Sequence, residues 1–139
     1  MDKKRVTQAL NNAMNLEIEG AIEYLYLSFN VFGPSRKVLQ GFLREQAQEG
    51  FDHATKMAEK LTSLGGVPDL SISVSYRPEK MNAMQILKRG LEREKKALEL
   101  YKSALPLAGD DVSLEDLLRG QIAAEQEHCE EVEKLLREG

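Results

Sequence analysis

The chain has 139 residues, a net charge of −4 at pH 7, a pI near 5.3, one cysteine and no tryptophan. Its length suffices for one domain with its own core, and its acidic balance argues against nucleic-acid or anionic-membrane partners. The lone Cys129 excludes an intrachain disulfide, and because the chain shows neither the apolar stretch of a signal peptide nor the ~20 apolar residues of a membrane span, we expect a cytoplasmic protein.

Helix-breaking residues divide the chain into four predicted helices. The first spans 4–32 and ends at the sequence FGPS, and the second spans 35–65, with Gly65 or Gly66 as its C-cap and a proline just beyond. The third spans 79–108 and begins at Pro78, which suits a first helical turn. The fourth spans 113–137 and opens on SLED, a variant of the capping box. This pattern predicts an all-α protein with a single domain over residues 1–139.

The connections between these helices predict their arrangement. The first and last links are only a few residues long, so each joins an antiparallel hairpin. The middle link, GVPDLSISVSYR, can extend to ~40 Å at ~3.3 Å per residue. A helix of about 30 residues is ~45 Å long, so this link can return along nearly the whole second helix. The expected fold is an antiparallel four-helix bundle with one long crossover.

Ionisable residues interrupt the apolar stripe of each predicted helix. They lie near the middle of their helices, at matching depth in the two hairpins. The five residues are Glu17, His53, Glu94, Glu125 and His128. Burying several carboxylates without compensation is strongly unfavourable, whereas a bound cation resolves the problem. Carboxylate and imidazole ligands without thiolate suit iron, manganese or zinc.

An internal repeat relates the two hairpins. The spacing from Glu17 to Tyr24 recurs from Glu94 to Tyr101, and the pattern LRxQxxxxxxH ends at both His53 and His128. The hairpins are therefore expected to pack about a pseudo-twofold axis through the metal site. In this alignment of the two halves, Glu125 corresponds to Gly50.

These residues resemble the ferritin and bacterioferritin family of di-iron carboxylate proteins. The resemblance rests on MNLEIEGAIEYLYLS, FLREQAQEGFDHATKM, LEREKKALELY and AAEQEHCEEVEKLL, and it covers nearly the whole chain. It implies a di-iron site with one Glu from each of two helices and a Glu-x-x-His from each of the others. The implied ligands are Glu17, His53, Glu94, Glu125 and His128.

The chain departs from the family pattern at three places. Gly50 stands where the resemblance implies a carboxylate that bridges the irons, and Phe51 stands where bacterioferritins have a haem-binding methionine. We therefore expect no haem. The chain ends after the fourth helix, whereas cage-forming members carry a fifth, so the resemblance leaves the size of the oligomer open beyond a homodimer.

The missing carboxylate leaves three glutamates against the four positive charges of two Fe(II) ions. Glu49, one residue before the gap, is the candidate replacement, with Asp52 a weaker one and a bridging water or hydroxide a further alternative. Otherwise the half-site at Glu17 and His53 is weakened, and Gly50 opens space at the metal. Glycine within a helix is unfavourable by about 1 kcal/mol relative to alanine.

The resemblance implies binding of Fe(II) and its oxidation by O2 or peroxide, in the manner of a ferroxidase that serves iron storage or detoxification. Tyr24 and Tyr101 are candidate catalytic residues that hydrogen-bond the ligands or supply an electron; alternatively they are core aromatics. Two other functions compete with this one. The first is a rubrerythrin-like peroxidase or di-iron oxygenase, and the second is a non-catalytic metal-binding subunit with a degenerate site.

Overall fold

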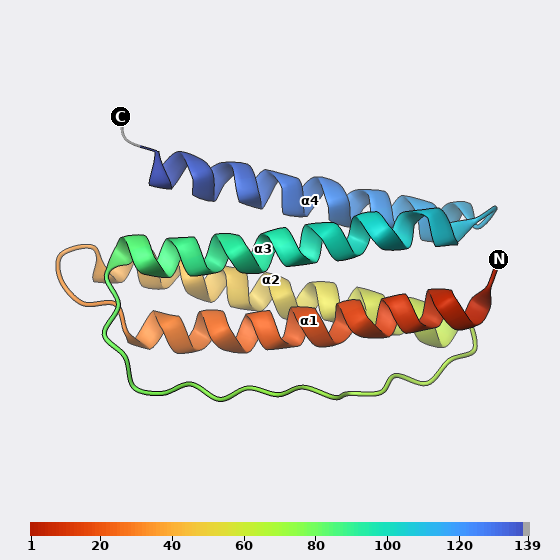
Figure 1. Ribbon diagram of the computed structural model, residues 1–139, viewed down its shortest axis with the longest axis horizontal. Coiled ribbons are helices and arrows are strands. Elements are labelled where there is room, and N and C mark those ends of the chain that lie inside the picture. Colours follow the sequence, from red (N-terminus) through yellow and green to blue (C-terminus); the bar gives the residue numbers. More distant parts are fainter. Residues whose placement is uncertain (138–139) are drawn as a thin grey trace.

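The computed structural model describes residues 1–137, which form two antiparallel helical hairpins (Figure 1). Their helices are α1 (Lys3–Phe29), α2 (Arg36–Ser63), α3 (Ala83–Ala104) and α4 (Val112–Leu136), with a short 3-10 helix, η1 (Leu105–Ala108), between the last two. Within these residues there is no strand, and no helix is both long and apolar enough to cross a bilayer. The expected four-helix bundle is confirmed. The last two residues of the expected domain, 138 and 139, lie outside the described part.

Side-chain caps explain where α3 and α4 begin. The prediction that α3 starts at Pro78 is wrong, because Asn82 and Gln85 form a reciprocal capping box that starts the helix four residues later. In α4, Asp111 accepts a hydrogen bond from the Leu114 amide, so the cap lies two residues before the predicted SLED motif. At the end of α2, Gly65 takes a positive φ of 90°, as expected for a glycine that follows a helix.

The crossover between α2 and α3 is held along α1 by a ladder of side-chain hydrogen bonds. The amides of Asp69, Ser71 and Ser73 donate to Asn11, Asn15 and Glu19 respectively. Two residues of an extended chain advance ~6.6 Å, and four residues of a helix advance ~6.0 Å, so the two spacings match. The crossover therefore runs the length of the bundle and leaves α2 parallel to α3, as predicted (Figure 1).

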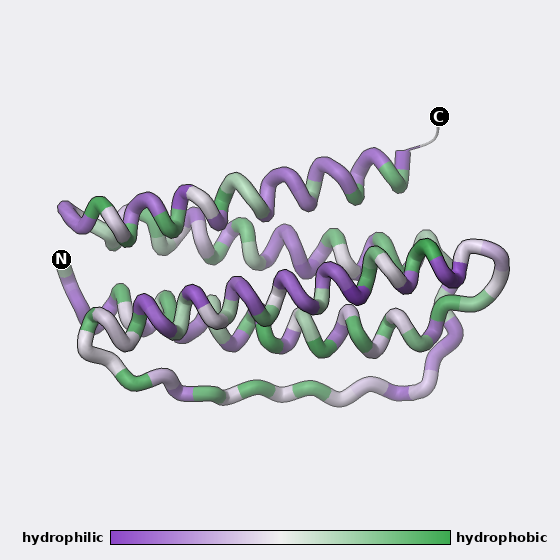
Figure 2. The backbone as a smooth tube through the Cα atoms, turned by 180° about the vertical axis from the view of Figure 1, so that it is seen from behind, coloured by the Kyte–Doolittle hydropathy of each residue, from purple (hydrophilic) through white to green (hydrophobic). Residues whose placement is uncertain are grey.

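Hydrophobic and hydrophilic residues recur in turn along every helix (Figure 2), and the buried hydrophobic ones form an apolar interior. This interior consists of two clusters at different levels. One includes Leu10, Met57 and Leu114, and the other includes Leu27, Leu43 and Ile86. Four buried ligand candidates, Glu17, His53, Glu94 and Glu125, belong to neither cluster. They lie at the level between the two, where the stripes of all four helices become polar.

Candidate metal centre

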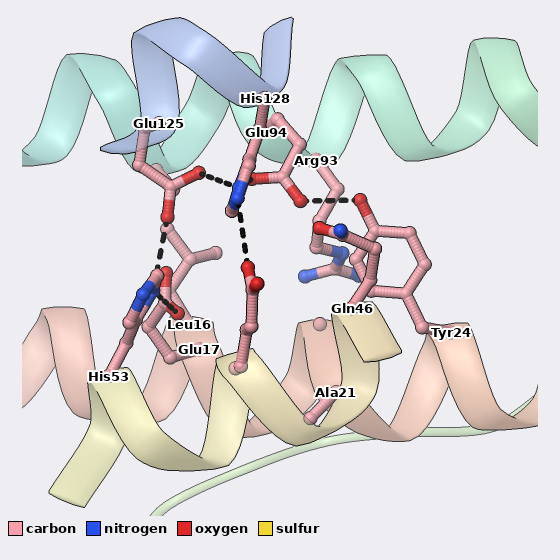
Figure 3. A pocket seen from close by; sticks show the side chains of 14 residues that line it. Leu16, Glu17, Ala21, Tyr24, Gln46, His53, Arg93, Glu94, Glu125 and His128 are labelled. Atoms are coloured by element: carbon pink, nitrogen blue, oxygen red, sulfur yellow. Dashed lines mark hydrogen bonds and ion pairs between the residues drawn. The ribbon is translucent and has the colours of Figure 1, made fainter. Parts of the chain in front are cut away.

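All five ligand candidates from the apolar stripes meet at one place inside the bundle (Figure 3). Four of these residues are at least nine-tenths buried, and Glu125 is only 1% exposed. The fifth, His128, is partly buried. Glu17 comes from α1, His53 from α2, Glu94 from α3, and the remaining two come from consecutive turns of α4.

The five side chains form two groups that share Glu125. In the first group, which we call site 1, Glu17 and His53 converge with Glu125; in the second, site 2, Glu94 and His128 converge with the same carboxylate. Within each group the ligand atoms lie within 4.8 Å of one another. One metal ion with bonds of about 2.0–2.2 Å can contact several ligand atoms only when those atoms lie this close to one another.

The distances show how Glu125 joins the two sites. Its Oε1 atom is 3.3 Å from Nδ1 of His53, and its Oε2 atom is 3.8 Å from Nδ1 of His128. Glu17 Oε2 lies 3.0 Å from the same nitrogen of His53, and Glu94 Oε2 lies 3.7 Å from that of His128. Each carboxylate oxygen of Glu125 therefore faces a different histidine.

The site fits a metal because its buried atoms lack other partners. Glu125 Oε2 and His128 Nδ1 are buried without a hydrogen-bond partner in the described residues. Neither carboxylate of Glu17 and Glu94 is paired with a lysine or arginine in that part of the chain. An oxygen- and imidazole-rich donor set of this kind suits Fe(II), Mn(II) or Zn(II).

Glu23 is a buried carboxylate outside the two metal groups, and it is paired with arginines. It is as buried as Glu17, but Arg89 and Arg93 lie 3.3 and 3.4 Å from its two oxygens. Its charge is therefore balanced by two cations between α1 and α3. The contrast supports a metal-binding role for the carboxylates that lack such partners.

Without metal, protons balance part of the charge at this site. Burial raises the pKa of Glu94 to about 7. The nearby carboxylates of Glu125 and Glu94 raise the pKa of His128 to about 10. Burial alone lowers the pKa of His53, but its hydrogen bonds to Glu125 and Glu17 outweigh that effect and raise the pKa to about 10. Both histidines are consequently cationic at neutral pH in the metal-free protein.

The two tyrosines have different surroundings, although the repeat makes them equivalent. Tyr24 donates its hydroxyl to Glu94 Oε1 at 2.6 Å, so it serves the glutamate of the other hairpin rather than Glu17 of its own helix. The hydroxyl of Tyr101 is buried without a partner in the described residues. Burial, followed by the charges of Glu17 and Glu125, raises the pKa of Tyr101 well above its ordinary value.

Glu49 and Asp52, the candidates for the missing ligand, lie in different environments. Glu49 Oε2 is 2.8 Å from Nε2 of His128, on the side of the ring away from Nδ1. This contact is a close ion pair whose angles fall outside those of a hydrogen bond. Asp52 is exposed and accepts a hydrogen bond from Gln48. Neither carboxylate is a member of the two metal groups.

Gly50 lines the cavity beside the ligands, but its missing side chain would point at α1. A Cβ atom built at Gly50 would lie 3.1 Å from the Ala21 Cβ and 3.1 Å from the Glu17 carbonyl oxygen. Such contacts are tighter than ordinary van der Waals distances. The glycine thus permits close packing of α2 on α1 next to Glu17, a reason that the sequence pattern did not reveal.

Other residues around the cavity were not predicted. Gln46 and Arg93 line it next to Tyr24 (Figure 3). Gly90 leaves room for the Tyr24 ring, because a Cβ there would lie 3.1 Å from a ring carbon. A glycine inside a helical pattern was the available signal for Gly90. Cys129 is buried, and burial raises the pKa of its thiol to about 11, so it is not a thiolate at neutral pH.

Comparisons with known proteins agree with this geometry. A family model described as a ferritin-like domain matches residues 7–139. No curated protein matches the chain in sequence. The fold is similar to a ferritin-like diiron-carboxylate protein from Bacillus anthracis, with a TM-score of 0.88, 27% identity and 99% of each chain covered.

Two further structures have a similar fold. One is the dodecameric thioferritin from Bacteroides fragilis, with a TM-score of 0.87 and 26% identity over 98% of this chain and 86% of that one. The other is a bacterioferritin from Rhodobacter capsulatus, with a TM-score of 0.82 and 22% identity over 96% of this chain and 84% of that one. The latter likeness concerns the fold alone.

Proposed function

Because the chain belongs to the ferritin-like family, we propose that it binds two Fe(II) ions as substrate and oxidises them with O2 or peroxide. The observation that carries this proposal is the position of Glu125, whose two oxygens face the histidines of two separate ligand groups. A carboxylate shared in this way can hold two metal ions side by side. The site thus keeps one shared carboxylate, although Gly50 supplies none.

Two Fe(II) ions side by side supply two electrons, which reduce O2 to hydrogen peroxide or peroxide to water. The protein's own contribution is to bind and orient. Glu17 and His53 hold one ion, Glu94 and His128 hold the other, and Glu125 lies between them. Metal binding displaces the protons of the two histidines, because only the neutral imidazole is a ligand.

Neighbouring residues hold these side chains in position. Tyr24 holds the Glu94 carboxylate through a 2.6 Å hydrogen bond, and it keeps its proton because burial and the Glu94 charge raise its pKa well above 10.0. We assign Tyr24 a positioning role at the ligand and leave Tyr101 as a buried aromatic near Glu17. Phe51 is 40% exposed where a haem-binding methionine would stand, so we propose iron chemistry without haem.

We further propose that the protein acts in the cytoplasm as a homo-oligomer and serves iron storage or detoxification. A structure of similar fold, the thioferritin from Bacteroides fragilis, is dodecameric. The outer surface near the turn between α1 and α2 also exposes large apolar side chains that suit contact with another copy. These are Leu25, Phe29, Phe32 and Val38.

Anaerobic titration with Fe(II), followed by exposure to O2 or peroxide, tests the proposal. The protein should bind two Fe(II) per chain and oxidise them, and Glu125→Ala should abolish both binding events because it contributes to both groups. Glu127→Ala, an exposed glutamate on the same helix, is the matched control and should leave binding unchanged. Unchanged stoichiometry in Glu125→Ala contradicts the site, and Fe(II) binding without consumption of either oxidant contradicts the enzymatic role.

A further inference from the structure

The two sites differ in what contacts Nε2 of each histidine, the ring nitrogen that faces away from Glu125. Nδ1 of each histidine faces the shared carboxylate. Behind His128, Glu49 Oε2 lies 2.8 Å from Nε2, whereas no ion pair or hydrogen bond involves Nε2 of His53 in the described residues. The pseudo-twofold relation between the hairpins therefore fails at this point.

The position of Glu49 argues against its being a direct ligand. Its Oε2 atom is buried against the His128 ring, but the side chain as a whole is 45% exposed, whereas that of Glu125 is 1% exposed. It contacts the imidazole nitrogen opposite to the one that faces Glu94 and Glu125. A carboxylate on the far nitrogen of a metal-bound histidine fixes the tautomer and the ring orientation and raises the basicity of the ligand.

Resting on the proposed metal site, we propose that Glu49 is a positioning residue that acts through His128 and makes site 2 the tighter of the two. Its exposure shows that it is not needed to fill the core, and it joins α2 to α4 across the site. The glycine that follows it lets α2 pack closely on α1 next to Glu17. In place of a bridging carboxylate on α2, the chain thus has two features. Gly50 allows close packing on α1, and Glu49 supports His128 on α4.

A titration with Co(II), followed by calorimetry and by visible absorption, tests this role without redox chemistry. The wild type should bind two ions with different affinities. Glu49→Ala should weaken the tighter binding event by about 10–100-fold, the range found when such an outer carboxylate is removed. The weaker event, the stoichiometry and the absorption per bound Co(II) should not change, because all direct ligands remain.

Two variants control the interpretation. Glu49→Gln keeps a side-chain oxygen of the same reach beside Nε2 but removes its charge, so it should recover part of the lost affinity. Glu45→Ala removes an exposed carboxylate one turn earlier on α2 and should bind like the wild type. In a His53→Ala background, where only site 2 keeps all its ligands, Glu49→Ala should cause the same loss.

Several results would overturn the inference. If Glu49→Ala binds Co(II) like the wild type, or weakens both events equally, Glu49 does not set the difference between the sites. If the absorption per bound ion changes, or one ion is no longer bound, Glu49 is a direct ligand. If the wild type itself binds no Co(II) and no Fe(II), the proposed function fails first, and that failure is visible before any variant is measured.

Discussion

Tyr24 of α1 donates its hydroxyl to Glu94 of α3 across 2.6 Å, whereas the repeat-related Tyr101 has a buried hydroxyl without a partner. We expect Tyr24→Phe to weaken Co(II) binding at site 2 by about 10-fold, because the hydrogen bond that favours the ionised carboxylate of Glu94 is lost. Tyr101→Phe should leave metal binding unchanged and preserve or raise stability. Equal effects of the two substitutions in calorimetry would refute this distinction.

The two glycines of α2 at positions 41 and 50 should respond differently to alanine. Gly41 is exposed, and a Cβ there meets nothing within 4 Å, so Gly41→Ala should raise the free energy of unfolding by about 0.5–1 kcal/mol. Gly50→Ala must displace α1, since its Cβ would meet Ala21 at 3.1 Å. Urea unfolding should show no comparable gain at Gly50; an equal gain at both positions contradicts the packing explanation.

In the metal-free protein, substituting a buried glutamate should change the free energy of unfolding differently with and without arginine partners. Glu23→Gln leaves Arg89 and Arg93 without their shared carboxylate and should lower the free energy of unfolding by about 1–3 kcal/mol. Glu94→Gln removes a buried charge but keeps an oxygen acceptor for Tyr24, so it should not destabilise the protein at pH 8. Urea unfolding in the presence of a chelator measures both effects. Strong destabilisation by Glu94→Gln would contradict an excess of carboxylates over cationic histidines at the metal-free site.

The metal-free protein should lose stability as the pH rises from about 5 to 10. Folding raises the pKa of Glu94 from 4.5 to about 7, and it raises that of His53 and His128 from 6.5 to about 10. The folded state therefore holds more protons than the unfolded state over this range, and its advantage declines as these protons leave. Urea unfolding at several pH values with a chelator present measures this decline.

The double variant His53→Gln with His128→Gln is the control for this pH dependence and should show a shallower decline. Bound Zn(II) should have the opposite effect, since metal binding needs deprotonated ligands and grows stronger with pH. A metal-free protein whose stability is constant or increases between pH 6 and 9 would contradict the proton balance described for the site.

The sequence predicted the bundle and the convergence of the five ligand candidates because both depend on periodicity. Interrupted apolar stripes located Glu17, His53 and Glu94 on the inner faces, and link lengths determined the connectivity. What the sequence could not predict depends on distances between helices. Glu23 lies in the same first helix as Glu17, and only the positions of two arginines on another helix distinguish a paired carboxylate from a ligand.

The environment of Gly50 was unpredictable for the same reason. A glycine opposite Glu125 in the repeat suggested an opening at the metal. Gly50 does line the cavity, but a Cβ there would also meet α1 closely, which the repeat could not show. The start of α3 was misplaced because Pro78 suits a first helical turn, whereas the helix begins after Asn82, which forms a capping box with Gln85.

Anomalous diffraction from crystals loaded with Fe(II) under anaerobic conditions tests the central claim most directly. We predict two iron peaks per chain, one among Glu17, His53 and Glu125 and the other among Glu94, Glu125 and His128, with higher occupancy at the second when iron is limiting. Iron bound elsewhere, or no iron between the four helices, would contradict the assignment of this site.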